Sequence, residues 1–343
     1  MIAFLQHKEE AVSREIIDVQ KPAYVKEAEL IGFDGIPALH EKAEDIRASQ
    51  ERFAGYREDG KLLGVISYEK SIHELTICRL VVHPDGFRKG IGRALVQFVI
   101  DQNEDAEKIE VVTAEKNNPA VSLYTQAGFV KTKTVKASEG LFLSVFHLYP
   151  KRKVEVVHYN EEWARLFSEE KDRLKLVLGP EIIDVHHVGS TSIPNMAAKP
   201  VIDILIAVKD IAAVNQYDSK MAELGYMPKG ENGMIGRRYF QKGGNKRTHH
   251  IHIYEGGHPD IERHLVFRDY LTAHPEIAKE YAALKKQLAA QYPDNIKQYI
   301  QGKTDWIKAA EEKAKRWKKG RNNANGRVVC YNSENEKNGG FTL

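Results

Sequence analysis

The chain has 343 residues, of which 42% are hydrophobic and 29% are charged, and its formal net charge is +3. This length fits two domains better than one, and the composition is that of a folded protein. The small net charge does not point to a nucleic-acid partner. No apolar run approaches the roughly 18 residues of a membrane-spanning helix, the N-terminus lacks a signal-peptide core, and Cys78 and Cys330 give no disulfide framework. We therefore expect a soluble, cytoplasmic protein with neither a nucleic-acid nor a membrane partner.

The first 150 residues predict an α/β unit. Helical spacing covers 13–32, although Pro22 should end or begin a piece of that helix. Two strands in 52–70 are joined by a turn at Asp59-Gly60. The remaining expected elements are, in order, a strand at 74–82, a glycine turn, a helix near 90–103, a strand at 108–114, a helix at 118–129 and strands near 130–136 and 141–149.

A second unit is expected to start at the basic segment 151–156. Its predicted elements are a helix at 160–178, strands at 182–188 and 200–208, a helix near 210–224, a hairpin within 237–255 that turns at Gly243-Gly244, and charged helices over 260–317. The Asn- and Gly-rich segment 321–343 has no sustained period and predicts a disordered tail. We expect domains at 1–150 and 151–320, followed by this tail.

The stretch 81–100 raises the first functional question, because an apolar strand breaks at a turn that contains Gly90 and Gly92 and then continues as a helix. The first amides of a helix have no partner inside it, and the helix dipole adds positive potential there. Glycine lets a ligand approach the backbone. Further positive charge comes from Arg88, Lys89 and Arg93. The spacing is neither a P-loop nor a dinucleotide fingerprint, so a phosphate cradle and a plain turn both remain open.

The run "LVVHPDGFRKGIGRAL" resembles motif A of the GNAT acyltransferases, Q/R-x-x-G-x-G/A, the loop that binds the pyrophosphate of acetyl-CoA. Gly90 and Gly92 fill the two small positions, whereas Phe87 stands where Gln or Arg is usual and the arginine is displaced to Arg88. A second signature of the family, N-x-x-A-x-x-L-Y-x-x-x-G-F, is matched by Asn117, Ala120, Leu123, Tyr124, Gly128 and Phe129. The resemblance is specific over 75–130 and looser over 1–74.

This resemblance implies a mixed central sheet flanked by helices, and an N-acetyltransferase that moves acetyl from acetyl-CoA to a primary amine by direct attack. It also implies that the strand before motif A splays from its neighbour, so that free amides near Val82 hold the pantetheine arm. The residues that the resemblance assigns to acetyl-CoA are Val82, Phe87, Arg88, Lys89, Gly90, Ile91, Gly92, Arg93, Ala94 and Asn117.

Tyr124 matches the tyrosine proposed to protonate the leaving thiolate, and the alternative is a helix residue that only packs its ring. Glu74 and Glu27 are the candidates for a general base, and an amine that loses its proton to water needs none. Cys78 lies on an apolar strand without a His partner and is expected in the core. The acceptor is a small-molecule or peptide amine, whose pocket we expect to be built by the first helices and the loop 32–44.

In the second half, "HHVGSTSIPNMAAKPVIDILIAV" places a Gly-Ser turn after one strand and Asp203 on the next, as in the nucleotidyltransferase fold. The half 153–318 resembles the GrpB-like (UPF0157) family in "HVGSTSIP", "KPVIDI", "RTHHIHI" and "HLVFRDYLTAHPE". One departure is Asn195-Met196, where Gly-Leu is expected. The resemblance implies a nucleotidyltransferase-like α/β domain with a helical C-terminal part.

The chemistry of this half stays open, because Leu205 stands where a second carboxylate of a D-x-D metal pair would be. Strand alternation puts His250 and His252 on one face, where they could bind a divalent metal with Asp203, contact phosphate or serve as satisfied polar residues. The candidate site residues of this half are Gly189, Ser190, Lys199, Asp203, Arg238, His250 and His252.

Two alternatives to an acetyltransferase follow from this second site. The second half could transfer a nucleotidyl or phosphoryl group from a nucleotide ligand, with the first half as a module that binds coenzyme A. Or the protein could be a non-catalytic acetyl-CoA sensor that reports occupancy through the second half.

Overall fold

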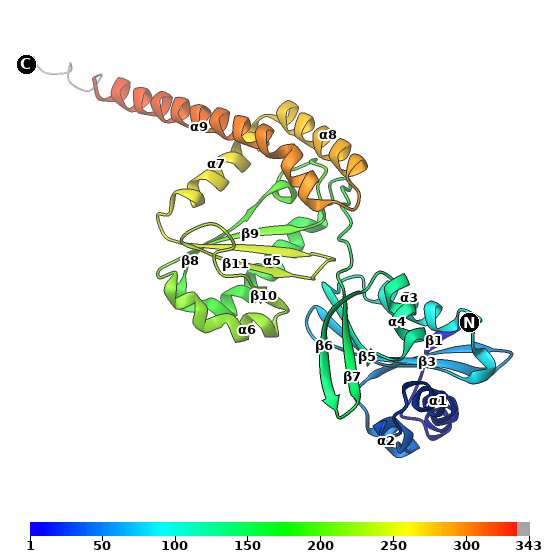
Figure 1. Ribbon diagram of the computed structural model, residues 1–343. Helices are drawn as coiled ribbons and strands as arrows, with labels where there is room; N and C mark the ends of the chain where they lie inside the picture. Colours follow the sequence, from blue (N-terminus) through cyan, green and yellow to red (C-terminus); the bar gives the residue numbers. More distant parts are fainter. Residues whose placement is uncertain (335–343) are drawn as a thin grey trace, which may run out of the picture. The chain divides into compact units, whose positions relative to one another are not determined.

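The computed structural model describes residues 1–334, with side chains as far as Arg321. The chain forms two compact units, Met1–Pro150 and a second that begins at Lys151. Each unit has its own mixed sheet with helices packed on it, which confirms the predicted α/β class (Figure 1). None of the helices in the described part of the chain is both long and apolar enough to cross a membrane.

The seven-stranded sheet of the first unit has the order β1-β2-β3-β4-β5-β7-β6. Its strands are β1 (Ile2–Phe4), β2 (Arg52–Glu58), β3 (Lys61–Lys70), β4 (Glu74–Val82), β5 (Lys108–Ala114), β6 (Val130–Ser138) and β7 (Leu141–Leu148). β4 and β5 are parallel, and the other neighbours in this sheet are antiparallel. At one edge, every residue of β6 is exposed, including Lys131, Lys133 and Lys136.

Four helices cover the two faces of this sheet. Figure 1 shows α1 (Glu10–Ile31) and α2 (Ala43–Ala48) on one face, and α3 (Ile91–Gln102) and α4 (Asn118–Gln126) on the other. On the first face, Ile16 and Val19 of α1 pack against Val65 and Val81 of the sheet. The helix α3 buries the stripe Ile91, Leu95, Val96 and Val99 on the opposite face. The sheet is therefore enclosed between two apolar layers.

The expected break at Pro22 is wrong, because α1 runs without interruption from Glu10 to Ile31 with Pro22 inside it. A proline in a helix interior costs about 3 kcal/mol. The helix buries Ile16, Ile17 and Val19 against the sheet, and each buried side chain of this size contributes roughly 1.5–3 kcal/mol. Packing thus outweighs the local cost of the proline.

A register shift between β3 and β4 changes the face on which the side chains of β4 lie. Ser67 pairs with Arg79 and Tyr68 with Ile77, so Cys78 is an extra residue in the ladder, a β-bulge. Before the bulge, Leu75 and Ile77 pack on the α3 side. After it, Val81 packs on the α1 side. The prediction that Cys78 lies in the core is wrong, because the bulge leaves this cysteine exposed.

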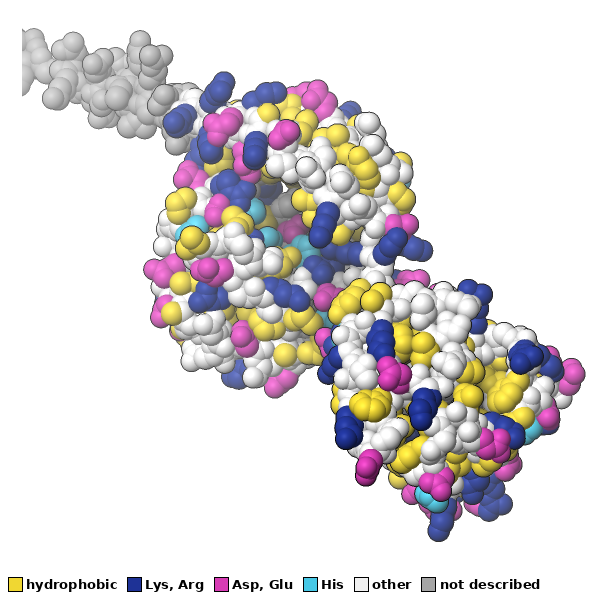
Figure 2. Space-filling model, in the orientation of Figure 1, with side chains coloured by type: hydrophobic (Ala, Val, Ile, Leu, Met, Phe, Trp, Pro, Cys, Tyr) yellow, Lys and Arg dark blue, Asp and Glu magenta, His cyan; other side chains and the backbone are white. Residues whose placement is uncertain are grey.

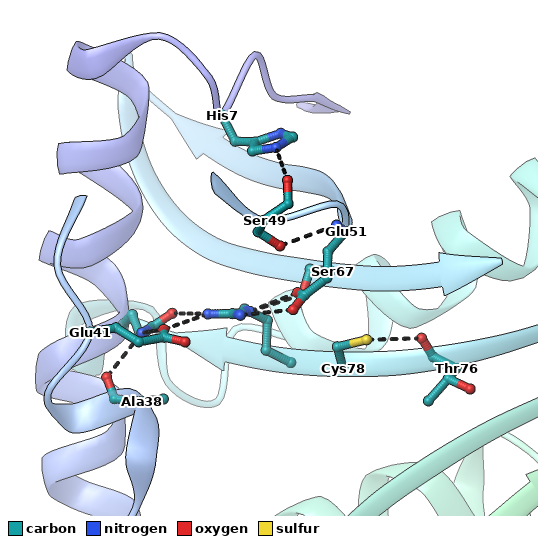
Figure 3. Close-up of polar contacts among 10 residues, drawn as sticks. His7, Ala38, Glu41, Ser49, Glu51, Ser67, Thr76 and Cys78 are labelled. Atoms are coloured by element: carbon teal, nitrogen blue, oxygen red, sulfur yellow. Dashed lines mark hydrogen bonds and ion pairs between the residues drawn. The ribbon is translucent and has the colours of Figure 1, made fainter. Parts of the chain in front are cut away.

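The bulge directs Arg79 into a buried polar network. Its guanidinium donates to both carboxylate oxygens of Glu51, each at 3.0 Å, and to Glu41 at 2.7 Å. It also donates to the side chains of Gln20 and Ser67. Figure 3 shows Glu41, Glu51 and Ser67 converging from separate segments of the chain. Burial alone would lower the pKa of Arg79, but its bonds to Glu51 and Glu41 raise it. The arginine thus stays charged and joins α1, the segments on both sides of α2, and the strands β3 and β4.

We expect Arg79→Met to lower the free energy of unfolding of the first unit by roughly 3–5 kcal/mol, because it leaves the Glu51 and Glu41 carboxylates in a largely buried place without the positive charge of Arg79. Arg14→Met removes an exposed partner of Glu10 on α1 and should cost less than about 1 kcal/mol. Tryptophan fluorescence does not follow the unfolding of the first unit, because all three tryptophans, Trp163, Trp306 and Trp317, lie in the second unit. The measurement is therefore differential scanning calorimetry. Equal losses in the two variants would contradict the network's role.

The five-stranded sheet of the second unit has the order β10-β11-β12-β9-β8. Its strands are β8 (Ile182–Val188), β9 (Ile202–Val208), β10 (Tyr226–Pro228), β11 (Arg237–Lys242) and β12 (His249–Glu255). The helices are α5 (Glu162–Leu178), α6 (Asp218–Glu223), α7 (Pro259–Ala273), α8 (Pro275–Gln291) and α9 (Ile296–Glu334). β9 and β12 are parallel, and the other neighbours are antiparallel.

The two faces of this sheet are covered differently. On one face, Ile204 of β9 and Ile251 of β12 pack with Leu174 of α5 and Met221 of α6. On the other face, α7 packs against β8, β9 and β12 in a small cluster that consists of Val188, Leu205, Tyr254, Ile261 and Leu265. α7, α8 and α9 share a further core of their own. Polar side chains occupy the rest of the second face.

The predicted disordered tail, 321–343, requires a correction in its first part, because α9 continues as a helix to Glu334. Each residue added to an existing helix gains a hydrogen bond, so a formed helix extends into sequence of weak helix propensity. Residues 335–343 lie outside the described part of the chain.

Candidate functional site

The loop after β4 ends in a glycine whose backbone only a few residue types adopt. Gly90 has φ +79° and is the N-cap of α3. The first bond of the helix runs from the Ala94 N–H to the Gly90 carbonyl at 3.0 Å. The amides of Ile91, Gly92 and Arg93 precede that bond and have no partner inside the helix. A Cβ placed on Gly90 would meet no atom within 4 Å, so open space lies beside these amides.

Gly92 has a different role from Gly90. A Cβ at Gly92 would lie 2.9 Å from the Leu123 Cδ1 atom, so this glycine lets α3 approach α4. The basic residues differ as well. Lys89 is held by Glu58 at 3.0 Å, which raises the lysine pKa, whereas no ion pair of Arg88 or Arg93 is found among the described residues. Phe87, at the position of the usual Gln or Arg, is about half exposed.

β4 and β5 separate before they reach this loop. Their pairing runs from Glu74↔Lys108 to Ile77↔Val111 and stops there, although β4 continues to Val82 and β5 to Ala114. The backbone of β4 between Cys78 and Val82 therefore has no neighbour on its β5 side. The assignment of Val82 to the pantetheine arm stays a prediction, and this gap in the ladder is the feature that it requires.

A hydrogen bond joins Glu27 of α1 to Asn117, in the segment between β5 and α4, and Tyr124 of α4 is close enough to be affected by the charge of Glu27. The Asn117 side-chain carbonyl accepts from the Ala120 N–H at 3.2 Å and caps α4, while its Nδ2 donates to Glu27 Oε1 at 2.9 Å. Burial raises the pKa of Glu27, and the bond from Asn117 partly offsets this. Tyr124 is only 4% exposed, and burial, together with Tyr24 and Glu27, raises the pKa of its phenol. The three residues form a polar cluster in an apolar surrounding.

Glu74 does not belong to this cluster. It stands at the first position of β4, where it pairs with Lys108 at 2.8 Å and is exposed. At about 3.3 Å per residue, the strand separates Glu74 from Val82 by roughly 26 Å. The structure therefore places Glu27, the alternative candidate, near Tyr124, and Glu74 at the far end of the strand. Sequence reasoning could not rank the two, because the Glu27–Asn117 contact joins residues 90 positions apart.

We expect Gly90→Glu to weaken acetyl-CoA binding at least tenfold, about 1.4 kcal/mol, because a carboxylate enters the open space beside the helix amides. Gly140→Glu is the control: Gly140 also has positive φ and open space, but it lies in the turn between β6 and β7. The measurement is isothermal titration of each folded variant with acetyl-CoA. Unchanged affinity in Gly90→Glu would exclude this loop as the binding site.

On the second unit, Asp203 and two histidines lie on the open face of the sheet. Asp203 of β9 is directly opposite His250 of β12. Its Oδ1 lies 3.0 Å from the Nδ1 atom of His250 and 3.8 Å from the Nε2 atom of His252. Burial alone would raise the pKa of Asp203, but these two histidines hold it well below its usual range. The next residues along the two strands, Ile204 of β9 and Ile251 and Ile253 of β12, face the core on the other side of the sheet, as alternation predicts.

Aromatic and basic groups surround this carboxylate. Tyr239 of β11 and His264 of α7 have their rings 5.2 and 5.4 Å from the ring of His252. Burial lowers the pKa of His264 to about 3, so it is neutral at physiological pH. Lys199, in the segment before β9, places its ammonium 5.1 Å from the centre of the Tyr299 ring. Figure 2 shows a hollow in this face of the second unit, with histidine, basic and acidic side chains around it.

The Gly-Ser turn is built around Asp203. Gly189 has φ +70° and ψ −172°, a conformation that is essentially restricted to glycine. A Cβ at this position would lie 2.3 Å from the Oδ2 atom of Asp203. Ser190 follows at the start of a short 3-10 helix, Ser190–Ser192. The glycine therefore allows the turn to close over the carboxylate.

The structure bears on two predictions for this half, the site role of Arg238 and the binding of a divalent metal. Arg238 pairs in register with Ile253, on the opposite face from Tyr239, and donates to Asn215 Oδ1 at 2.6 Å. The structure thus does not bring Arg238 to the Asp203 side, because neighbouring residues of a strand point to opposite faces. No group of three or more His, Cys, Asp or Glu residues arranged to hold a metal occurs among the described residues. His250 is instead bonded to the carboxylate that would have been its fellow ligand.

We expect Gly189→Ala to lower the free energy of unfolding of the second unit by at least about 2 kcal/mol more than Gly257→Ala. Both glycines have positive φ, but a Cβ at Gly257 would meet nothing, whereas one at Gly189 would overlap the Asp203 carboxylate. The positive φ costs either alanine variant about 1–3 kcal/mol, so the expected difference comes from the overlap of the new Cβ with Asp203. Urea unfolding followed by tryptophan fluorescence reports on this unit. A similar loss in both variants would mean that the turn can move away from Asp203.

Comparison with known proteins agrees with this division. A GNAT acetyltransferase domain model matches residues 9–146, and a GrpB protein model matches residues 153–313. UPF0157 protein YqkA of Bacillus subtilis is 77% identical over 343 residues and covers all of both chains. The chain belongs to the UPF0157 family.

Two further matches cover only part of the chain. Glutamate-rich protein GrpB of Alkalihalophilus pseudofirmus is 35% identical over 162 residues, 46% of this chain and 93% of that protein. The crystal structure of GrpB from Enterococcus faecalis is 45% identical, covers 48% of this chain and 99% of that one, and gives a TM-score of 0.46. The two family models together confirm the predicted pairing of a GNAT domain with a GrpB-like domain.

Proposed function

We propose that the first unit acetylates a primary amine with acetyl-CoA, and that Glu27 and Tyr124 carry out the proton transfers. The GNAT domain supports acetyl transfer as the general activity. The observation that supports these two residues is the hydrogen bond from Asn117 to Glu27, whose charge acts on the buried Tyr124. The acceptor is an amine of a small molecule or a peptide.

The residues present fit the pyrophosphate and the thioester arm of acetyl-CoA. The unpaired amides before Ala94, the space beside Gly90, and Arg88 and Arg93 suit an anion at a helix N-terminus. The unpaired edge of β4 offers backbone groups to an amide-containing arm. When bound, acetyl-CoA supplies an activated acyl group whose carbon–sulfur bond breaks as the new carbon–nitrogen bond forms.

Glu27 and Tyr124 have environments that suit opposite proton transfers. Burial raises the pKa of Glu27, which makes its carboxylate a better acceptor of the amine proton than an exposed glutamate is. The raised pKa of Tyr124 keeps the phenol protonated, so that it has a proton to give to the leaving thiolate. Asn117 contacts Glu27 and begins the helix that carries Tyr124, and so fixes the position of both groups.

We expect Glu27→Gln to lower kcat at least a hundredfold, within the range for loss of a general base, with little change in acetyl-CoA affinity. In the wild type, kcat/KM should fall as the pH drops through the raised pKa of Glu27, since the base must be deprotonated. The variant should lose that acidic limb. Release of free thiol, with a panel of amines as acceptors, is the measurement.

Glu29→Gln, on the same helix but exposed, is the matched control and should behave as the wild type. Tyr124→Phe should slow turnover without weakening acetyl-CoA binding. A Tyr124→Phe protein that loses thermal stability but turns over normally would reduce the tyrosine to a packing residue. Normal turnover in Glu27→Gln would exclude Glu27 as the general base.

A further inference from the structure

The helical part of the second unit contains a buried lysine whose ammonium makes no hydrogen bond with the described residues. This residue is Lys285 of α8, and it is only 2% exposed. The ammonium lies over the face of the Tyr281 ring, whose centre is 4.6 Å away. Burying an ammonium without a hydrogen-bonded partner is costly, so an unpaired one is not expected from folding alone.

Two more lysines lie beside it. Lys199, before β9, and Lys303 of α9 place their ammonium groups 5.1 and 5.3 Å from the centre of the Tyr299 ring. We call Lys199, Lys285 and Lys303 the lysine cluster. Burial first, and then repulsion from the other two lysines, lowers the pKa of Lys285 to about 7. Lys199 is affected in the same way by Lys303, Arg152 and Arg247, and its pKa is also about 7.

The three lysines come from separate elements that are held together by packing. The segment before α5 is tied to the end of α8, where the Val154 N–H donates to the Pro293 carbonyl at 2.7 Å. Val154, Leu288 and Tyr299 form one buried cluster. Tyr281 stacks on Trp306 with ring centres 4.4 Å apart. Rigid aromatic side chains therefore keep like charges close together, although the charges repel one another.

Asp203 is the acidic group that acts on all three ammonium groups, and it is already bonded to His250. It cannot neutralise three lysines. A bound anion would do so, and it would also supply the hydrogen-bond acceptor that Lys285 lacks. Asp203 and one phosphate dianion together carry three negative charges, but Arg152 and Arg247 also repel Lys199. The positive charge around Asp203 therefore exceeds what a single phosphate balances, and the arrangement fits a ligand with several linked phosphates.

We infer that the second unit binds the polyphosphate group of a small ligand at the lysine cluster, with Lys285 as its buried contact. This activity is separate from acetyl transfer and does not depend on it. The chemistry is shared by inorganic polyphosphates and by nucleoside di- and triphosphates. The buried rings of Tyr281 and Tyr299 are occupied by packing and are not offered to a base, so the phosphate chain itself is the recognised group.

The experiment titrates the full chain with tripolyphosphate, ATP and orthophosphate, in buffer without divalent metal, and follows heat and thermal unfolding. A Gly90→Glu background removes binding by the helix terminus of the first unit. We expect tripolyphosphate to bind and to raise the melting temperature seen by tryptophan fluorescence. Binding of ATP but not tripolyphosphate would show that the nucleoside is recognised, and orthophosphate binding equally well would contradict a site for several phosphates. Binding of none of these probes would overturn the proposal.

Lys285→Met tests the contact. It removes the unpaired charge, so the free variant should melt at the same temperature as the wild type or higher, while its affinity for tripolyphosphate falls at least tenfold. Lys286→Met, the exposed neighbour on α8, should change neither property. Lys303→Met offers a second test if Lys285→Met fails to fold. Wild-type affinity in the folded Lys285→Met or Lys303→Met variant would overturn the assignment.

Discussion

One extra residue in β4 controls the architecture of the first unit. The bulge at Cys78 lets Leu75 and Ile77 pack towards α3 and then turns Arg79 and Val81 towards α1. A bulge also bends its strand and increases the local twist. The pairing of β4 with β5 ends at Ile77, immediately before the bulge. The same residue thus separates the strands where a cofactor arm can enter and directs the buried arginine that secures α1.

The second unit depends on a comparable device, built from a glycine rather than a bulge. Gly189 allows the turn after β8 to close on Asp203, and the parallel pairing of β9 with β12 places His250 opposite that carboxylate. Each of the two sheets in the described chain has one parallel pair of strands, and in both units a polar group lies beside that pair. The lysine cluster differs, because its charges are gathered by helices and aromatic packing.

The sequence predicted regular elements well where a periodic pattern has clear ends. The predicted strands 74–82, 108–114 and 182–188 agree with β4, β5 and β8 residue for residue. Short elements without such a pattern, α2 and the strands β1 and β10, were not predicted, because their formation depends on partners elsewhere in the chain.

The site was only partly predictable for the same reason. Motif resemblance found Gly90, Asn117 and Tyr124, which share one local region. It could not show that Cys78 is a bulge, since strand pairing rather than composition determines this. It also missed Lys285, because a lysine in a charged helical segment has the pattern of a solvated residue. Only the packing of Tyr281 and of the first turns of α9 around it reveals that it is buried.

The exposed edge of the first unit's sheet also limits how the protein associates. β6 pairs with β7 on one side only, and its other side presents unpaired backbone groups along nine residues. Such an edge is a template for adding a strand from another molecule. Lys133 and Lys136 place positive charge along it, whereas the charge of Lys131 is paired with Glu115, so two copies that approach edge to edge repel each other through Lys133 and Lys136. This strand therefore guards against aggregation, and replacing its lysines would expose a surface on which chains could stack.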